Sequence, residues 1–193
     1  VYGPVYVGYN FVNSNDTDPD NFVITLEGYI CGAVVEHNTI YGRSNGIGVG
    51  AWGGYSFGDI LINNNIIQLS TIVPHVGIYI QEAQGCIRIE ENTIHAGTDD
   101  FGIDIDETVN GRLTILRNVI DVNIDTGIYV ESVGSCTIVH NTIYNATYCG
   151  IYLESTVPIT AAVKNNIVVG TDVNNTVGIY GGVSGNCTKR VGF

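Results

Sequence analysis

The chain has 193 residues, enough to bury a sizeable core, and its 45% hydrophobic and 13% charged residues are typical of a folded domain. Acidic residues outnumber basic ones 19 to 7, so the net charge of −12 argues against nucleic acid and anionic membranes as partners, since both are bound through Lys and Arg patches. No apolar run approaches the roughly 18 residues of a membrane helix, so we expect no membrane insertion. The length predicts one domain over 1–193. Because the chain contains no Met, we expect it to be either a processed chain or a segment of a longer protein.

A template of the form apolar-x-x-Asn-x-apolar recurs seven times along the chain, first at residues 7–12 and next at 35–40. The spacings between successive template Asn residues are 28, 27, 27, 26, 23 and 25. Such narrow spacing indicates a structural repeat. The seven residues are Asn10, Asn38, Asn65, Asn92, Asn118, Asn141 and Asn166.

Two more short strands are predicted in each period. One directly precedes the template Asn, as in 60–62, 87–89 and 113–115. The other follows a Gly-Ile-x-apolar pattern that begins at Gly46, Gly77, Gly102, Gly127, Gly150 and Gly178. Strict alternation and β-branched residues favour strands over helices. Three strands in about 25 residues predict an all-β, single-stranded parallel β-helix of about seven coils. We expect the template Asn side chains to point inward and to form an amide ladder; a column of ligand-binding Asn is the alternative.

With its Gly-Ile-x-Ile and Asn-x-Ile motifs, the chain resembles the right-handed parallel β-helix repeats of pectate-lyase-like and surface-solenoid proteins. The resemblance covers residues from about Val5 to Thr188. It implies a right-handed solenoid but leaves the function open, because the family includes polysaccharide lyases, glycosidases, epimerases, phage tailspikes, adhesins and purely structural solenoids.

Stacked coils place the outward residues of the Gly-Ile-x-Ile strands in columns, because residues i and i+2 of a strand share a face. One column holds Thr25, Gly48, Tyr79, Asp104, Tyr129, Tyr152 and Tyr180. The next holds Glu27, Gly50, Gln81, Asp106, Glu131, Glu154 and Gly182. A third column, two residues before the Gly, holds Ser44, His75, Asp100, Asp125, Tyr148 and Thr176.

This acidic, Tyr-rich face is the candidate functional site, and it has three possible functional roles. Ca²⁺ could bind to clustered carboxylates, with Asp100, Asp104, Asp106 and Asp125 as ligands. A glycan could bind without being cut, through Tyr79, Tyr129, Tyr152, Glu154, His75 and Trp52. A glycosidase acid and base could be drawn from Asp104, Asp106 and Glu131. The alternative to all three is a polar face that keeps a long sheet soluble.

A polysaccharide lyase, as the resemblance implies, would hold Ca²⁺ on such a face and would use an Arg or Lys base. Arg112 is the only cation near the turn after Asp106, while Arg88 and Arg117 fall on other strands. The Asn-Thr-Asp and Gly-His-Gly motifs of polygalacturonases and the Asp-Pro-His-Glu motif of alginate epimerases are absent. These absences weigh against a specific enzyme.

Five Cys residues leave one without an intramolecular partner. Cys31, Cys86, Cys136 and Cys187 are expected in one column in alternate coils, about 10 Å apart, which is too far for a disulfide. Cys149 is expected in another column. We therefore predict buried free thiols.

The four His residues are expected in turns, exposed to solvent. His75 and His95 lie in neighbouring coils, and a pair between His and Asp99 or Asp100 is possible. Trp52 lies in a Gly-rich insertion at 46–58 that could stack on sugars or fold back as a local lid.

Open solenoid ends expose unpaired strand edges, which need a cover. We therefore expect an extracellular or cell-surface structural solenoid that associates head to tail with copies of itself, or that is covered by flanking domains. It requires no cofactor, with Ca²⁺ as a possible ligand and polysaccharide as a possible partner. The alternative is a polysaccharide-active enzyme, a lyase or glycoside hydrolase, that uses the carboxylates of the same face.

Overall fold

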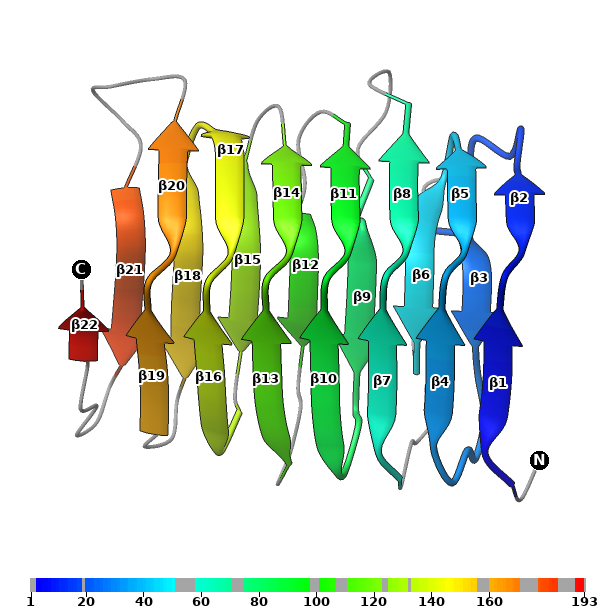
Figure 1. Cartoon of the computed structure of the whole chain (residues 1–193), viewed down its shortest axis with the longest axis horizontal. Coiled ribbons are helices and arrows are strands. Elements are labelled where there is room, and N and C mark those ends of the chain that lie inside the picture. Colours follow the sequence, from blue (N-terminus) through cyan, green and yellow to red (C-terminus); the bar gives the residue numbers. More distant parts are fainter. Residues whose placement is uncertain are drawn as a thin grey trace.

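The computed structural model describes residues 3–18, 20–50, 58–70, 75–97, 101–106, 111–122, 125–131, 133–155, 160–170, 177–183 and 190–192. Within these residues the chain forms strands and turns, and the strands stack into an elongated solenoid with the two termini at opposite ends (Figure 1). In the described residues no helix has the length and apolar character needed to cross a bilayer.

The described strands form three parallel sheets, which we call the first, second and third sheet after the order in which the chain visits them. The first and second sheets face the viewer in Figure 1, and the third lies behind them. The first sheet holds β1 (Val5–Gly8), β4 (Ala33–Glu36), β7 (Ile60–Asn63), β10 (Cys86–Glu90), β13 (Arg112–Leu116), β16 (Ser135–Val139), β19 (Thr160–Lys164) and β22 (Arg190–Gly192). The second sheet holds β2 (Phe11–Asn13), β5 (Thr39–Gly42), β8 (Ile66–Leu69), β11 (Thr93–Ala96), β14 (Val119–Val122), β17 (Thr142–Ala146) and β20 (Ile167–Gly170).

The third sheet positions the candidate site. It holds β3 (Phe22–Leu26), β6 (Asn45–Val49), β9 (Ile78–Gln81), β12 (Phe101–Asp106), β15 (Thr126–Glu131), β18 (Cys149–Ser155) and β21 (Val177–Val183). Every strand pairs with the equivalent strands of the neighbouring coils, so each position of the repeat forms a column along the solenoid. The three-strand parallel β-helix predicted from the repeat is confirmed.

The core is a set of apolar ladders made mainly of Ile. One ladder runs through Ile47, Ile78, Ile103, Ile128 and Ile151, all at 0% exposure. β-Branched side chains suit this interior, because they pack well on a pleated surface and lose little rotamer freedom. Each fully buried Ile contributes about 1.5–3 kcal/mol of transfer free energy, so the ladders are the main stabilising term.

The predicted Asn ladder is confirmed. From Asn10 to Asn141, the main-chain N–H and the Nδ2 of each ladder Asn both donate to Oδ1 of the ladder Asn in the next coil; from Asn92 to Asn118 both distances are 3.0 Å. The same Nδ2 also donates to a backbone carbonyl in the preceding coil, as from Asn118 to Ile89 at 2.9 Å. The five central side chains are buried, whereas Asn10 is exposed and Asn166 is half-buried. The ladder thus satisfies buried polar groups at every corner between the first and second sheets.

The residue before each ladder Asn adopts a left-handed backbone conformation without being Gly. The φ values lie between 51° and 60° at Tyr9, His37, Asn64, Glu91, Arg117, His140 and Asn165. This conformation costs roughly 1–2 kcal/mol for most L-residues. It turns the chain sharply, so that the Asn side chain enters the interior, and the ladder hydrogen bonds compensate for the strain.

The Gly of the Gly-Ile motif is required by close packing at the opposite corner. A Cβ added to Gly102 would lie 2.6 Å from the carbonyl oxygen of Gly127 in the next coil and would also strike Ile120. Backbone in the next coil cannot move away without breaking the strand register. Gly therefore marks the beginning of this strand because no side chain fits there.

The Cys prediction is confirmed in part. Cys31, Cys86, Cys136 and Cys149 are free thiols, and Cys187 lies outside the described residues. The predicted common column is wrong, because Cys136 aligns with Leu113 whereas Cys86 aligns with Arg112. That shift of one residue places the two side chains on opposite faces of the sheet. Cys136 and Cys149 are accordingly buried, whereas Cys31 and Cys86 are exposed, contrary to expectation.

Candidate functional site

The first two predicted columns of the third sheet are present in the structure, whereas Ser44 and His75 of the third column are buried. Tyr79, Asp104, Tyr129, Tyr152 and Tyr180 are successive register partners from β9 to β21. In the second column Gln81 pairs with Asp106, and Glu131 pairs with Glu154. The alternating pattern of the sequence therefore brings together residues that lie several coils apart in the chain.

Three tyrosines of the first column, Tyr129, Tyr152 and Tyr180, form a continuous stack, whereas Tyr79 is separated from them by Asp104 and packs on Phe22. The rings of Tyr129 and Tyr152 have centroids 5.4 Å apart at 18°, and those of Tyr152 and Tyr180 have centroids 4.9 Å apart at 23°. Phe101 packs against Tyr129 at 5.0 Å, and Tyr148 packs against Tyr152 at 6.3 Å. Aromatic pairs in these ranges stabilise one another beyond their buried area, so the stack is a fixed platform.

Carboxylates of the second column hold the phenol groups. The hydroxyl of Tyr129 donates to Oε2 of Glu154 at 2.8 Å, with Oε2 of Glu131 at 3.4 Å. The hydroxyl of Tyr79 donates to Oδ2 of Asp106 at 3.1 Å. Burial is the main cause that raises the pKa of Tyr129, followed by the bond to Glu154. These bonds fix the orientation of the rings.

Glu131 is the carboxyl group with the clearest electrostatic perturbation on this face. Partial burial is the main cause that raises its pKa, followed by the negative charge of Asp106 and a hydrogen bond to that residue. Asp104, in the register between Tyr79 and Tyr129, is only 8% exposed.

A hollow of about 180 Å³ lies beside the tyrosine stack. It is lined by Phe101, Asp125, Thr126, Tyr129, Tyr148, Tyr152 and Glu154. Pockets for drug-sized ligands usually measure about 300–1,000 Å³, so this one has room for a single ring or a short part of a longer chain. Its aromatic walls and carboxylate rim suit a ligand with an apolar face and several hydroxyl groups.

The predicted site residues divide between those that line this hollow and those that do not. Tyr129, Tyr152, Glu154 and Asp125 line it. Asp106 and Glu131 lie farther along the same strands, and Tyr79 lies toward the N-terminal end of the stack. Asp100 and Trp52 fall outside the described residues.

The expectation of a solvent-exposed turn is wrong for His75. This side chain has 0% exposure, and neither ring nitrogen has a hydrogen-bond partner among the described residues. His75 lies next to Ser44 in the third predicted column, and Ser44 is also buried. A ligand on the outer face of the sheet does not reach a fully buried ring. His95 pairs with Asp121 at 3.1 Å, whereas Asp99 and Asp100 lie outside the described residues, so the predicted pair with them stays a prediction.

The described residues contain no group of three or more His, Cys, Asp or Glu side chains placed to hold a metal ion. Because Asp100 lies outside this set, the Ca²⁺ site of the sequence analysis stays a prediction.

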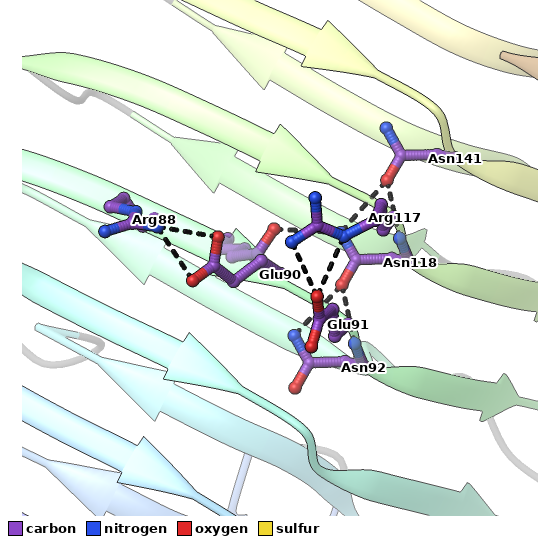
Figure 2. A network of polar contacts seen from close by, with 8 residues as sticks. Arg88, Glu90, Glu91, Asn92, Arg117, Asn118 and Asn141 are labelled. Carbon is purple, nitrogen blue, oxygen red and sulfur yellow. Dashed lines mark hydrogen bonds and ion pairs between the residues drawn. The ribbon is translucent and has the colours of Figure 1, made fainter. Parts of the chain in front are cut away.

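The Arg residues that could act as a base lie away from the acidic face. Arg88 donates to both carboxylate oxygens of Glu90 at 2.9 Å, and Arg117 donates from Nε to Oε1 of Glu91 at 2.8 Å. Figure 2 shows both ion pairs beside the ladder of Asn92, Asn118 and Asn141. They therefore belong to the first sheet and its corner, and the described columns of the third sheet carry carboxylates without Lys or Arg.

Phe101 and Thr126 line the hollow but were not among the site residues predicted from the sequence. They are register partners directly before the Gly of their strands. Strict alternation predicts that this position shares the inner face with the Ile two residues later. The sequence pattern therefore predicts a side chain that faces the core, not the site. Phe101 instead packs against Tyr129 of the outward column. The rotamers that open a hollow there have no sequence signal.

The model of the family described as the right-handed beta helix region matches residues 11–173. The chain therefore belongs to this family, as the resemblance implied. Comparisons with curated proteins and with solved structures gave no match.

Proposed function

We propose that this protein is a β-helix scaffold that binds a neutral or amino-sugar polysaccharide along the third sheet. The hollow beside the tyrosine stack carries this proposal, because aromatic faces and acceptor carboxylates are arranged together there. Sugar rings have an apolar face that packs on aromatic rings and hydroxyl groups that donate to carboxylates.

Charge selects the class of polysaccharide. The chain has a net charge of −12, and the described columns of this face carry Asp106, Glu131 and Glu154 without a neighbouring cation. An acidic polysaccharide would be repelled, since like charges across an interface cost free energy. Neutral polysaccharides avoid this cost. Amino sugars carry positive charge and are attracted to the carboxylates.

The same geometry favours binding over hydrolysis. The two carboxyl groups of a glycosidase stand about 5–5.5 Å apart in retaining enzymes and about 6.5–9.5 Å apart in inverting ones. Asp106 lies close enough to Glu131 for its charge and a hydrogen bond to raise the pKa of Glu131. A hydrogen-bonded pair is closer than either separation, so these two carboxyl groups do not match a glycosidase acid and base.

The test is retardation of the protein in native gels that contain soluble mannan, xylan, β-glucan, chitosan or polygalacturonate. We expect retardation by at least one neutral polymer or by chitosan, and none by polygalacturonate. Tyr152→Ala should abolish it, whereas Tyr144→Ala, an exposed tyrosine of the second sheet, should not. Equal retardation of both variants would refute the proposed site.

End-to-end association is a second candidate function, and the polarity of the Asn ladder favours it. Each ladder Asn donates toward the C-terminal end and accepts from the N-terminal end. Among the described residues no donor reaches Oδ1 of the exposed Asn10. The donors at the C-terminal end of one copy therefore match the acceptor at the N-terminal end of another. Such heterologous contacts extend into filaments unless they close a ring.

The stacking strands constrain this association. The first sheet has β22 on β19, one strand more than the other two sheets. A second copy can therefore continue the Asn ladder only if its β1 replaces β22 as the strand that pairs with β19. Light scattering at rising concentration should reveal growing particles, and Val7→Lys on the half-buried β1 should stop the growth. A wild-type monomer at millimolar concentration would rule this function out.

A further inference from the structure

The outer face of the second sheet is apolar and uncovered. Of the twelve large apolar or aromatic side chains exposed in the described residues, seven lie on this one face. They are Phe11, Tyr41, Ile66, Val119, Tyr144, Ile167 and Val169. Exposed patches of this kind mark interaction sites. The glycan-binding site on the third sheet makes no use of this face.

The side chains alternate in size along one column of this face. Phe11, Ile66, Val119 and Ile167 occupy alternate coils, and the coils between them carry Thr39, Thr93 and Thr142. The result is a row of ridges with a shorter, partly polar side chain between each two. A flat face of Ile or Val alone could bind a second apolar surface at any offset along the solenoid. The alternation on this face repeats every two coils, so it favours particular offsets.

The neighbouring column places a hydrogen-bonded His–Asp pair at the middle. From β5 to β20 it reads Tyr41, Gln68, His95, Asp121, Tyr144 and Val169. His95 and Asp121 are adjacent at 3.1 Å and both remain partly exposed, at 41% and 38% of the side chain. They are the only charged or titratable groups in the described part of the two columns apart from the tyrosines.

We propose that two copies of this chain pair through the second sheet, around a two-fold axis that runs along the strands between β11 and β14. This rotation places β11 opposite β14 of the second copy, β8 opposite β17 and β5 opposite β20. Val119 then faces Thr93, Ile66 faces Thr142 and Ile167 faces Thr39. His95 faces Asp121 of the other copy in both directions. The same operation matches side-chain size and hydrogen-bonding groups, which is the self-complementarity that an isologous dimer requires.

The dimer is weak. Six strands about 4.8 Å apart and four residues of about 3.3 Å each give a footprint of roughly 380 Å² per copy. Stable interfaces bury about 800 Å² per partner, and smaller ones belong to transient complexes. We therefore expect association at about 10–1,000 μM, the range typical of weak pairs. Because a two-fold contact is closed, it stops at the dimer and does not form filaments.

Sedimentation velocity of the full chain from 5 μM to 1 mM tests this proposal. A reversible monomer–dimer equilibrium is expected for the Val7→Lys variant, in which end-to-end growth is blocked, and the variants below are made in that background. Val119→Lys should raise the dimer Kd at least about tenfold, because it buries two charges against Thr93 of the other copy. Thr137→Lys, on the outer face of the first sheet, is the matched control and should leave the Kd unchanged. Thermal melts monitored by circular dichroism show that each variant is folded.

Thr93→Ile separates interdigitation from mere stickiness. It adds apolar area, so non-specific adhesion would strengthen, whereas an interlocked pair would weaken because the larger side chain collides with Val119 of the other copy. The proposal predicts a weaker dimer. A wild-type monomer at 1 mM, a dimer that survives Val119→Lys, or a dimer tightened by Thr93→Ile would each overturn it. Loss of association through Val7→Lys alone would assign the contact to the solenoid ends and would also overturn it.

Discussion

At the scale of single residues, the Asn ladder shows how a buried polar group can stabilise rather than destabilise. The amide of Asn118 makes hydrogen bonds in three directions: to Oδ1 of Asn141, to the carbonyl of Ile89, and from the donors of Asn92. Each unsatisfied buried group costs about 1–3 kcal/mol. The ladder therefore acts as one unit in which each amide depends on its neighbours.

Asn118→Leu should lower the free energy of unfolding by about 3 kcal/mol or more, because the donors of Asn92 and the carbonyl of Ile89 would lose their partner. Urea unfolding followed by circular dichroism measures this value. Asn10→Leu, at the exposed end of the ladder, is the control and should cost less than about 1 kcal/mol. Equal losses in both variants would contradict the ladder's energetic role.

His75 gives the protein a pH-dependent stability. Burial lowers the pKa of His75 from its ordinary value of 6.5. The unfolded chain therefore binds a proton at a higher pH than the folded chain does, and stability is complete above about pH 6.5 and falls as the pH drops below it. The free energy of unfolding should decline as the pH falls below about 6.5.

His75→Leu should remove that decline, because no titratable group remains at this buried position. His140→Gln, at an exposed turn, should keep it. Chemical denaturation at half-unit pH intervals compares the three proteins. A wild-type stability that stays flat from about pH 7 to about pH 5 would be inconsistent with a buried, uncharged His75.

At the scale of the elements, the strand positions were predictable because the repeat fixes them. The Asn and Gly-Ile motifs placed the strands and the outward columns correctly, since each motif marks a corner with its own steric demand. Cys86 and Cys136 were misplaced because an error of one residue moves a side chain to the other face. The burial of His75 and the hollow beside Tyr152 depend on packing between coils, which no single repeat encodes.

The corner before the third sheet is the element most sensitive to added volume. Gly102→Ala should lower the free energy of unfolding by about 1–3 kcal/mol, because the new Cβ meets the carbonyl of Gly127 and the side chain of Ile120. Gly3→Ala, where the space around the Cβ is open, should be close to neutral. Thermal unfolding of both variants gives the comparison; equal melting temperatures would show that the corner can relax.

At the scale of the whole molecule, the three sheets have different outer surfaces. The third carries stacked tyrosines and carboxylates, the second carries an apolar column broken by Thr, and the first carries the Arg–Glu pairs. A solenoid with these faces can hold a glycan on one side and a second copy on another without steric conflict. Pairing would double the number of glycan sites per particle and raise avidity for a long polymer.

We propose that a carbohydrate chain lies on the third sheet beside Tyr152. A titration of the isotopically labelled protein of 20.7 kDa with a neutral or amino-sugar hexasaccharide, followed by amide chemical shifts, tests it most directly. The hexasaccharide is taken from the polymer that retards the protein most. Shifts should cluster on β12, β15 and β18, at Phe101, Tyr129 and Tyr152. Unchanged spectra at millimolar sugar, or shifts confined to the first or second sheet, would contradict the account.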